Sequence, residues 1–360
     1  VPEYEAPLGE VEKSLAKIWK GLLKVDRVGR HDNFFELGGH SLLAVQGVNA
    51  LKQAGIEIST ADLFRQPTIK SLAQAIALGV PQLDNVAIPV RKIGTGRPLF
   101  LVHDGGGLMA YIDLLAPFID QSIPLYGLQP TPLGHSYITN MEGLAERMVR
   151  AIRNVQPLGP YRIAGWCFGG MLAYEIATQL LGRDQSVEFL GLFDTYHPEW
   201  YLAQRIKTSS DMKQNVEANF LLGSVRHELT TERRDLRPTT ELETIAKKLG
   251  LDALIERCRE LSLIPRSLVG LGNLDIKQVL VRRRSMAIAL GTYRPKDVPI
   301  VVNLFSTLCG NAAAPMRGWD VGLPLAQIRV HPVSGNDDTI MKFPHIESLG
   351  SRVTQILQNQ

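Results

Sequence analysis

The sequence has 360 residues, more than one average domain needs, and its 45% hydrophobic and 21% charged residues are typical of a globular protein. The net charge of +3, with charges interspersed along the chain, argues against a nucleic-acid-binding surface. No apolar run is long enough to cross a bilayer, and the polar start VPEYEAPLGE does not resemble a signal peptide. We therefore expect neither nucleic acid nor a membrane among the partners.

Three cysteines are scattered along the chain, at Cys167, Cys258 and Cys309. Their number is odd and no C-x-x-C pair occurs, so the sequence predicts neither a disulfide framework nor a metal site. A reducing, cytoplasmic setting is expected. The chain begins with Val1 rather than methionine, which predicts a fragment of a longer protein.

The first 80 residues predict a small helical domain. Residues 9–24 place apolar side chains on one helical face, namely Val11, Leu15, Ile18, Leu22 and Leu23. A second helix is expected from Ser41 to Gly55, a short turn over 62–64, and a last helix capped by Thr68. A domain of this length is near the lower limit for a self-sufficient core.

The stretch DNFFELGGHSL, residues 32–42, is the most specific in this domain. Two glycines and a histidine precede Ser41, which opens a helix. The serine could simply cap that helix, but a helix N-terminus also favours a phosphate through its free N–H groups and its dipole. The stretch resembles the carrier-protein motif of nonribosomal peptide synthetases, whose serine receives a 4′-phosphopantetheine arm. This resemblance covers residues 1–80 and implies a four-helix carrier domain with Ser41 as the attachment site.

Residues 81–97 are rich in proline and glycine, the composition of a linker or of strand and turn edges, and we expect a linker there. Beyond it, apolar strands alternate with helices, which predicts a parallel sheet covered on both faces. Residues 199–292 interrupt this alternation, and we expect their helices to form a lid over the carboxyl ends of the strands. The expected helices are 199–222, 239–249, 252–262 and 273–291.

The stretch IAGWCFGG, residues 163–170, predicts a strand, a sharp turn and a helix start, with Cys167 at the turn. Gly165 and Gly169 flank the cysteine two residues away on each side. The pattern resembles the G-x-S-x-G nucleophile elbow of α/β-hydrolases with sulfur in place of oxygen. The resemblance implies that residues 98–360 form a thioesterase domain of the α/β-hydrolase fold with a helical lid insertion. The start of the following helix is expected to lower the thiol pKa.

A nucleophile of this type needs a base and a carboxylate that orients the base. In α/β-hydrolases the chain order is nucleophile, acid, base. Asp194 ends the strand after the elbow and His345 follows the last strand, so both fit this order at the sheet edge where ligands bind. Alternatives that stay open for these two roles are Asp320, Asp337, Asp338 and His331.

The oxyanion of the reaction needs two N–H donors. We expect one from Phe168, just after the nucleophile, and the other from Gly106 or Gly107 in the loop VHDGGGL. The alternative interpretation of this loop is a glycine turn that ends the first strand.

Two further features are expected to be structural. Cys258 and Cys309 are interpreted as packing residues. The basic run VRRRS, residues 281–285, favours a solvated helix face over a contact with the phosphate of the arm.

The whole chain resembles the C-terminal peptidyl carrier protein–thioesterase pair of a nonribosomal peptide synthetase. This implies release of a peptidyl or aminoacyl chain from the arm on Ser41 through an acyl-Cys167 intermediate, by hydrolysis or by cyclisation to a lactone or lactam. Transfer from one sulfur to another keeps the acyl group activated, which suits closure of a strained ring. The implied partners are upstream condensation and adenylation domains and a phosphopantetheinyl transferase.

Three alternatives stay open. The hydrolase-like part could be a catalytically silent carrier-docking module, although the complete candidate triad disfavours this. It could be an editing thioesterase that clears stalled acyl groups, although fusion to a single carrier favours programmed release. Finally, Cys167 could be an introduced replacement for serine.

Overall fold

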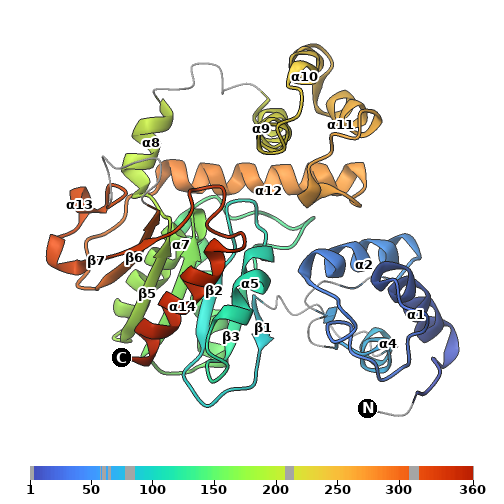
Figure 1. Ribbon diagram of the computed structural model, residues 1–360, viewed down its shortest axis with the longest axis horizontal. Coiled ribbons are helices and arrows are strands. Elements are labelled where there is room, and N and C mark those ends of the chain that lie inside the picture. The colour runs from blue at the N-terminus through green and yellow to red at the C-terminus, as the bar shows by residue number, and fades with distance from the viewer. Residues whose placement is uncertain are drawn as a thin grey trace.

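The computed structural model describes residues 4–56, 58, 62–63, 66–77, 86–206, 215–307 and 316–359. Cys309, expected to be a packing residue, lies outside the described residues. A helical domain at the N-terminus is followed by a larger α/β domain, and the two stand beside each other in the ribbon view (Figure 1).

The helical domain contains α1 (Gly9–Leu23), α2 (Ser41–Gln53) and α4 (Ile69–Ala77). These helices enclose an apolar core that includes Leu15, Trp19, Phe34, Ala44, Leu51, Leu63 and Leu72. Oγ1 of Thr68 accepts a hydrogen bond of 3.2 Å from the amide of Ser71, so the expected cap of the last helix is confirmed. The expected turn over 62–64 is described only at Asp62 and Leu63, where the backbone is helical.

Within the described ranges, seven strands form one sheet in the order β1-β3-β2-β4-β5-β6-β7. Their bounds are β1 Ala87–Arg91, β2 Leu99–Val102, β3 Leu125–Leu128, β4 Tyr161–Trp166, β5 Val187–Phe193, β6 Val302–Thr307 and β7 Ile328–Val333. All neighbouring strands are parallel except β1 and β3, which are antiparallel. The alternation of strands and helices along the sequence therefore predicted the parallel sheet correctly, because each crossover returns the chain to the same end of the sheet.

The segment expected to be a linker contributes a strand to this sheet. Residues 87–91 form β1, and Ile88 pairs with Gly127 of β3 at the sheet edge. Pro89 has no amide hydrogen, which an edge strand tolerates because one of its sides has no partner strand. The prediction of a linker throughout 81–97 is therefore wrong for β1, where the alternative of a strand edge holds.

Helices cover both faces of the sheet. The helices α6 (Met141–Val155) and α7 (Phe168–Leu181) share one apolar core with the sheet, and α5 (Ala110–Leu115) and α14 (His345–Gln358) share the other. This arrangement is the three-layer fold expected of α/β-hydrolases. The shorter elements are η1 Ala116–Phe118, η2 Arg266–Leu268, η3 Leu325–Gln327 and α13 Trp319–Gly322.

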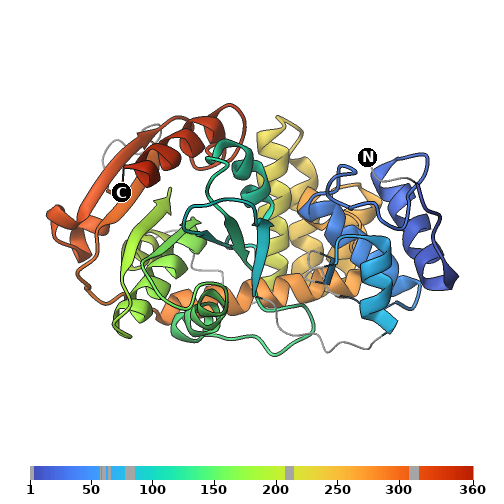
Figure 2. The same ribbon diagram turned by 90° about the horizontal axis from the view of Figure 1, so that it is seen from below.

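Five α-helices lie between β5 and β6 in the described part of the chain. They are α8 Pro198–Ile206, α9 Val216–Thr231, α10 Arg237–Lys248, α11 Gly250–Glu260 and α12 Asn273–Thr292. The single helix expected over 199–222 is thus two helices, and residues 207–214 lie outside the described residues. The helices α9 to α12 have an apolar core of their own, and α12 crosses the upper edge of the sheet (Figures 1 and 2).

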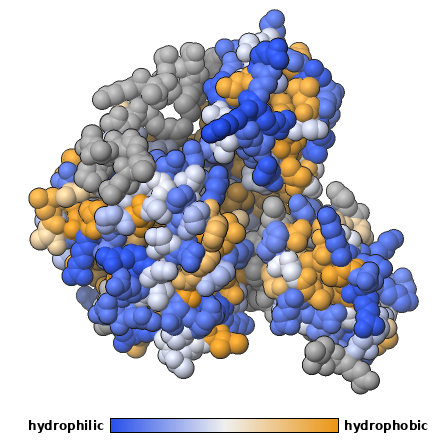
Figure 3. All heavy atoms as spheres, in the orientation of Figure 1, coloured by the Kyte–Doolittle hydropathy of each residue, from blue (hydrophilic) through white to orange (hydrophobic). Residues whose placement is uncertain are grey.

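The helical domain contacts this layer of helices. Val45 of α2 packs against the apolar core of α9 to α12, and the side chain of Gln46 lies against Gly270. The helix α2 also contacts α5 of the larger domain. Among the described residues, α2 is thus a helix through which the helical lobe (right in Figure 3) meets the larger body.

Candidate active site

Cys167 lies on a sharp turn between a strand and a helix, as its glycine spacing predicted. The strand β4 ends at Trp166, α7 begins at Phe168, and the cysteine between them has φ 53° and ψ −117°. A positive φ is strained for a side chain with a Cβ, and such strain occurs most often at functional sites. The turn depends on close backbone approach, because a Cβ at Gly165 would lie 2.2 Å from the carbonyl of Gly169.

Cys167 as a residue is half-buried, so the elbow does not seal it completely inside the core, although its thiol is largely removed from solvent. The thiol pKa is raised to about 11, chiefly by burial and in part by Asp104, Asp194 and Asp337, against the lowering effect of the backbone N–H of Phe168. The expectation of a lowered pKa is therefore wrong in this structure. The helix N-terminus does act in the expected direction, but loss of solvent and three nearby carboxylates outweigh it.

Asp194 follows β5 and is almost completely buried, with a side-chain exposure of 2%. Its Oδ1 accepts a hydrogen bond of 2.5 Å from Nη2 of Arg317 and lies 3.3 Å from Oγ1 of Thr307. The pKa of Asp194 is raised to about 7, chiefly by burial and also by the nearby carboxyl of Asp337, against the lowering effect of Arg317. The carboxyl is thus poised between its two protonation states near neutral pH.

His345 is the first residue of α14 and is half-buried. A hydrogen bond of 2.9 Å joins its Nδ1 to Oγ of Ser334. Among the described residues, no hydrogen bond joins His345 to Cys167 or to Asp194. The three predicted triad residues therefore follow β4, β5 and β7 on the same edge of the sheet, but this structure does not link them by hydrogen bonds.

The alternatives for the acid and the base fall into two groups. Asp337 is part of the site, because its Oδ1 lies 3.3 Å from Nη2 of Arg317 and its Oδ2 accepts a hydrogen bond of 3.2 Å from Tyr196. Asp320 is exposed on α13, and Asp338 faces His227 of the lid at 3.8 Å. His331 lies within β7 and contacts Asn303, and burial lowers its pKa to about 4, so it is a packed residue.

The glycine loop after β2 is organised by Asp104. Oδ1 of Asp104 accepts hydrogen bonds from Gly106 at 2.8 Å and from Leu108 at 2.9 Å, and its carbonyl accepts one from Gly107 at 2.9 Å. The two glycine amides expected to bind an oxyanion therefore already have acceptors in this structure. Gly105 has no hydrogen-bond acceptor for its amide among the described residues, and a Cβ at this position would lie 3.2 Å from Cβ of Phe168.

The basic run on α12 is not the solvated face that the sequence favoured. Arg282 is buried and donates hydrogen bonds to the carbonyls of Thr131, at 3.3 Å, and Gly107, at 3.2 Å. Arg283 lies over the ring of Phe220, 4.9 Å from its centroid, and Arg284 is exposed and forms an ion pair with Glu217. The reason is that α12 lies across the sheet edge, so one of its faces is covered.

Two of the residues that shape this site gave no signal in the sequence. Arg317 and Thr307 are far from Cys167 along the chain, and neither belongs to a motif with a known spacing. Arg282 was noted as part of a basic run but was assigned to the wrong surface. Only the order of the strands in the sheet brings these side chains to the carboxyl ends of β2, β5 and β6.

The loop before Ser41 explains the glycines of the first motif. Phe34 is buried against Trp19, with ring centroids 4.9 Å apart, and a Cβ on Gly39 would lie 2.3 Å from its ring. The carbonyl of His40 accepts the first hydrogen bond of α2, from Ala44 at 2.8 Å. His40 is thus the capping residue and Ser41 the first residue inside the helix, where a phosphate group would meet free backbone N–H groups.

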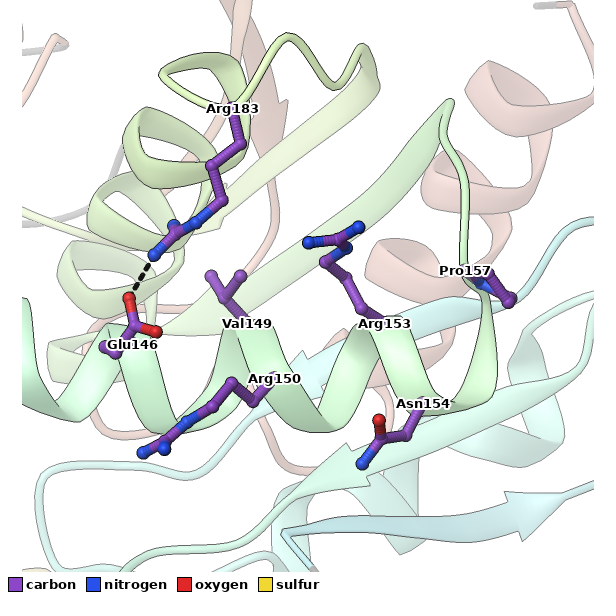
Figure 4. Close-up of a pocket in the computed structure, with 7 residues that line it drawn as sticks. All are labelled: Glu146, Val149, Arg150, Arg153, Asn154, Pro157 and Arg183. Carbon is purple, nitrogen blue, oxygen red and sulfur yellow. Dashed lines mark hydrogen bonds and ion pairs between the residues drawn. The ribbon is translucent and has the colours of Figure 1, made fainter.

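Other features of the described residues do not add to this site. No group of His, Cys, Asp or Glu among them could hold a metal ion, and no helix there is long and apolar enough to cross a membrane. A surface hollow is lined by α6 and the turn that follows α7, where Arg183 and Glu146 form an ion pair across it (Figure 4). That hollow lies on the outside of the helices, away from the strand ends that carry Cys167.

Comparison with known proteins assigns both parts of the chain. Residues 13–76 match the family model of the phosphopantetheine attachment site, and residues 97–262 match the model of the thioesterase domain. The chain is a carrier domain followed by a thioesterase domain. A thioesterase domain implies hydrolase activity, and the carrier domain is the site where phosphopantetheine is attached.

Relatives of this carrier–thioesterase chain include nonribosomal peptide synthetases. It is 35% identical over 290 residues to the dimodular nonribosomal peptide synthase of Bacillus subtilis (strain 168), covering 79% of this chain and 11% of that protein. The crystal structure of holo-AB3403, a four-domain synthetase bound to AMP and glycine, matches 99% of this chain and 27% of its own chain at 28% identity and a TM-score of 0.66.

The thioesterase domain also resembles that of NocB in covalent complex with a fluorophosphonate nocardicin G analogue. The identity is 25% and the TM-score 0.51, over 76% of this chain and 99% of the NocB domain. The chain corresponds to only a small part of its synthetase relatives. It spans 11% of the length of the Bacillus subtilis protein, and less of the malpibaldin and malpinin synthetases of Mortierella alpina, which it also resembles. The similarity therefore concerns the carrier and thioesterase domains rather than a whole synthetase.

Proposed function

We propose that the thioesterase domain releases a peptidyl or aminoacyl chain from a thioester through an acyl-Cys167 intermediate. The observation that carries this proposal is the strained φ of 53° at a partly exposed cysteine that receives the N–H of the next residue. A buried packing cysteine has no need of such a backbone, whereas a nucleophile must be aimed out of the sheet edge.

Ser41 is proposed as the attachment site on the carrier. Its position inside the first turn of α2, after two glycines and the exposed His40, leaves backbone N–H groups available to a phosphate. The first turn of α2 holds no acidic residue that would repel the phosphate. When attached, the 4′-phosphopantetheine arm supplies a flexible thiol that presents the acyl group as a thioester.

Acylation is proposed to begin when His345 exchanges its bond with Ser334 for a bond with Asp194. Nε2 of the imidazole then takes the proton of Cys167, and Sγ forms a bond to the thioester carbonyl carbon. The oxyanion receives the N–H of Phe168, and the amide of Gly105 is the second donor in place of Gly106 or Gly107. The carbon–sulfur bond of the substrate breaks, and the leaving thiolate takes the proton from His345.

Release uses the same groups in reverse. His345 takes a proton from water, or from a hydroxyl or amine of the bound chain, and this nucleophile attacks the acyl carbon. The bond to Sγ breaks and the proton returns to Cys167, which leaves a free acid, a lactone or a lactam. Exchange between two thioesters is nearly balanced in energy, so the acyl group keeps enough activation for ring closure.

The proposed partners follow from the arm and from the small share of a synthetase that the chain represents. A phosphopantetheinyl transferase must modify Ser41, and upstream condensation and adenylation domains must supply the acyl chain. The face of α2 that carries Val45 already contacts the lid core, so the carrier and the thioesterase domain are positioned as neighbours in one chain.

The test loads Ser41 with a set of acyl-pantetheines from coenzyme A derivatives and identifies the released species by mass spectrometry. We expect release by the wild type, no loading of Ser41→Ala, and loading without release for Cys167→Ala. Cys258→Ala, which removes a buried thiol far from the elbow, is the matched control. Release by Cys167→Ala at the wild-type rate would contradict the nucleophile.

The variant Cys167→Ser separates a native thiol from an introduced one. If the thiol is the native nucleophile, the serine variant should lose rate or change the ratio of cyclic to linear product, because a hydroxyl is a weaker nucleophile and its ester is less activated. A faster enzyme with the same products would indicate that the site was shaped for serine.

A further inference from the structure

The most unusual feature outside the predicted triad is a guanidinium shared by two carboxylates. Arg317 has a side-chain exposure of 1%, and its Nη2 lies 2.5 Å from Oδ1 of Asp194 and 3.3 Å from Oδ1 of Asp337. The two carboxylates belong to different loops, one after β5 and the other after β7. Arg317 therefore connects the loop that begins with the predicted acid, Asp194, with the loop that leads to His345.

The remaining contacts of Arg317 fix its orientation. Nη2 also donates to Oγ1 of Thr307 at 2.7 Å and to the carbonyl of the same residue at 3.2 Å. Nη1 donates to the hydroxyl of Tyr196, whose ring centroid lies 4.6 Å from Cζ of the arginine. These contacts restrain the guanidinium of Arg317, and the restrained guanidinium in turn fixes the position of the Asp194 carboxylate.

The charge balance of the cluster is uneven. One guanidinium faces two carboxylates, and the other groups that face Asp194 or Asp337 are the neutral Tyr196 and Thr307, with the thiol of Cys167 nearby. When both carboxylates are ionised, the cluster has one negative charge more than Arg317 can neutralise. The buried member, Asp194, cannot be stabilised by water, whereas Asp337 has a side-chain exposure of 57%.

A purely structural ion pair would not require Asp337. An exposed carboxylate at 3.3 Å contributes little to folding, because solvent screens the attraction and the side chain loses freedom. The negative charge of Asp337 instead changes the protonation of Asp194, which is desolvated and contacts the same guanidinium. Asp337 thus acts on the protonation of a neighbour more than on the stability of the fold.

We propose that Arg317 and Asp337 are positioning residues of the release reaction, which together orient Asp194 and set the pH above which it can serve His345. The proposal rests on the proposed role of Asp194. Arg317 favours the ionised form of that carboxyl and Asp337 disfavours it, so the two residues have opposite effects on the same group. Neither touches the reacting atoms.

The sign of the effect follows from the charges. Below its pKa the carboxyl of Asp194 is neutral and no longer stabilises a protonated His345, so the rate falls as the pH falls. Removing the negative charge of Asp337 lets Asp194 stay ionised to lower pH. Removing the positive charge of Arg317 makes Asp194 accept its proton at higher pH and leaves a buried carboxylate without its partner.

The test measures kcat/KM against pH for the full chain, with an acyl-N-acetylcysteamine thioester as the soluble substrate. Asp337→Asn should move the acidic limb to lower pH by about half a unit or more, a typical effect of one nearby charge. Asp338→Asn, the same change at the next residue, should move it by less than half as much, because that exposed carboxylate faces His227. Arg317→Gln should move the limb to higher pH, and Arg317→Lys should restore part of the shift.

Each outcome has a definite meaning. An Asp337→Asn profile that coincides with the wild type overturns the proposal, even if Asp194→Asn is inactive. An Asp194→Asn variant with full activity instead overturns the proposed role of Asp194, whatever the profiles show. If Arg317→Gln fails to fold by circular dichroism, the comparison of Asp337→Asn with Asp338→Asn decides alone, because Asp337 is exposed and its replacement leaves the core intact.

Discussion

Nδ1 of His345 lies 2.9 Å from Oγ of Ser334, and this hydrogen bond holds the imidazole on the loop after β7 rather than on Asp194. Gly335, which follows Ser334 in the chain, packs closely against the imidazole, because a Cβ at this glycine would lie 3.0 Å from Cγ of His345. Catalytic hydrogen bonds are often formed only when substrate is bound, so this arrangement describes a resting position of the base.

Ser334→Ala should therefore make the site easier to activate. The lost hydrogen bond is worth about 1 kcal/mol, which corresponds to an increase of up to about fivefold in kcat/KM. The measurement is steady-state release from a soluble thioester. Ser351→Ala, on the exposed side of α14, is the control and should leave the rate unchanged. A tenfold loss in Ser334→Ala would mean that the serine orients the imidazole for the reaction instead of retaining it.

The thiol of Cys167 should react slowly with alkylating agents when no substrate is bound. Burial raises its pKa to about 11, so little thiolate is present at pH 7 and the rate of alkylation by iodoacetamide should rise up to pH 10 and beyond. Peptide mapping distinguishes this residue from Cys258, which is fully buried and should stay unlabelled while the protein is folded. An inflection below pH 8 would instead indicate a thiolate–imidazolium pair at rest.

Gly169→Ala should destabilise the thioesterase domain strongly. A Cβ there would lie 2.5 Å from the carbonyl oxygen of His103, and that backbone cannot move without disturbing β2. We expect a loss of about 3 kcal/mol in the free energy of unfolding, measured with denaturant. Gly223→Ala is the matched control, since nothing lies within 4 Å of its new Cβ and the exposed helical site should gain about 0.5 to 1 kcal/mol. Equal stability of the two variants would show that the elbow is looser than the structure indicates.

Arg282→Lys should slow the reaction more than it weakens substrate binding. The arginine spans the carbonyls of Thr131 and Gly107, and a single ammonium cannot reproduce this fork, so the glycine loop should lose its fixed position. We expect kcat to fall about tenfold, a typical size for loss of a positioned donor, with KM nearly constant. Arg284→Lys, an exposed partner of Glu217, should behave as wild type. Unchanged kinetics in Arg282→Lys would show that the contact of Arg282 with the glycine loop does not affect the reaction.

The elements with a local signal were predicted well from sequence. The two glycines around Cys167 predicted a strand, a turn and a helix, because only glycine allows the backbones of Gly165 and Gly169 to approach each other. The first motif likewise placed Ser41 at the start of a helix. In both cases the requirement lies within a few residues of the position it explains.

The errors concern interactions that depend on distant parts of the chain. The edge strand β1 forms because it can pair with the free edge of β3. The proline and glycine content of residues 81–97, taken alone, favoured a linker. Likewise, Asp104 competes for the amides of Gly106 and Gly107, and Ser334 for the imidazole of His345. Such competition between nearby acceptors is decided by side-chain packing, which motif spacing does not encode.

The strand β1 also limits how far the carrier can travel. Nine peptide units join Ala77, the last residue of α4, to Val86, beside the start of β1, so their Cα atoms can be separated by at most about 30 Å. With the sheet edge as a fixed point, Ala77 is confined to a sphere of that radius around Val86, and the reach of Ser41 exceeds it only by the distance from Ala77 to Ser41 within the carrier. Partners that modify or load Ser41 must therefore approach close to the edge of the thioesterase domain.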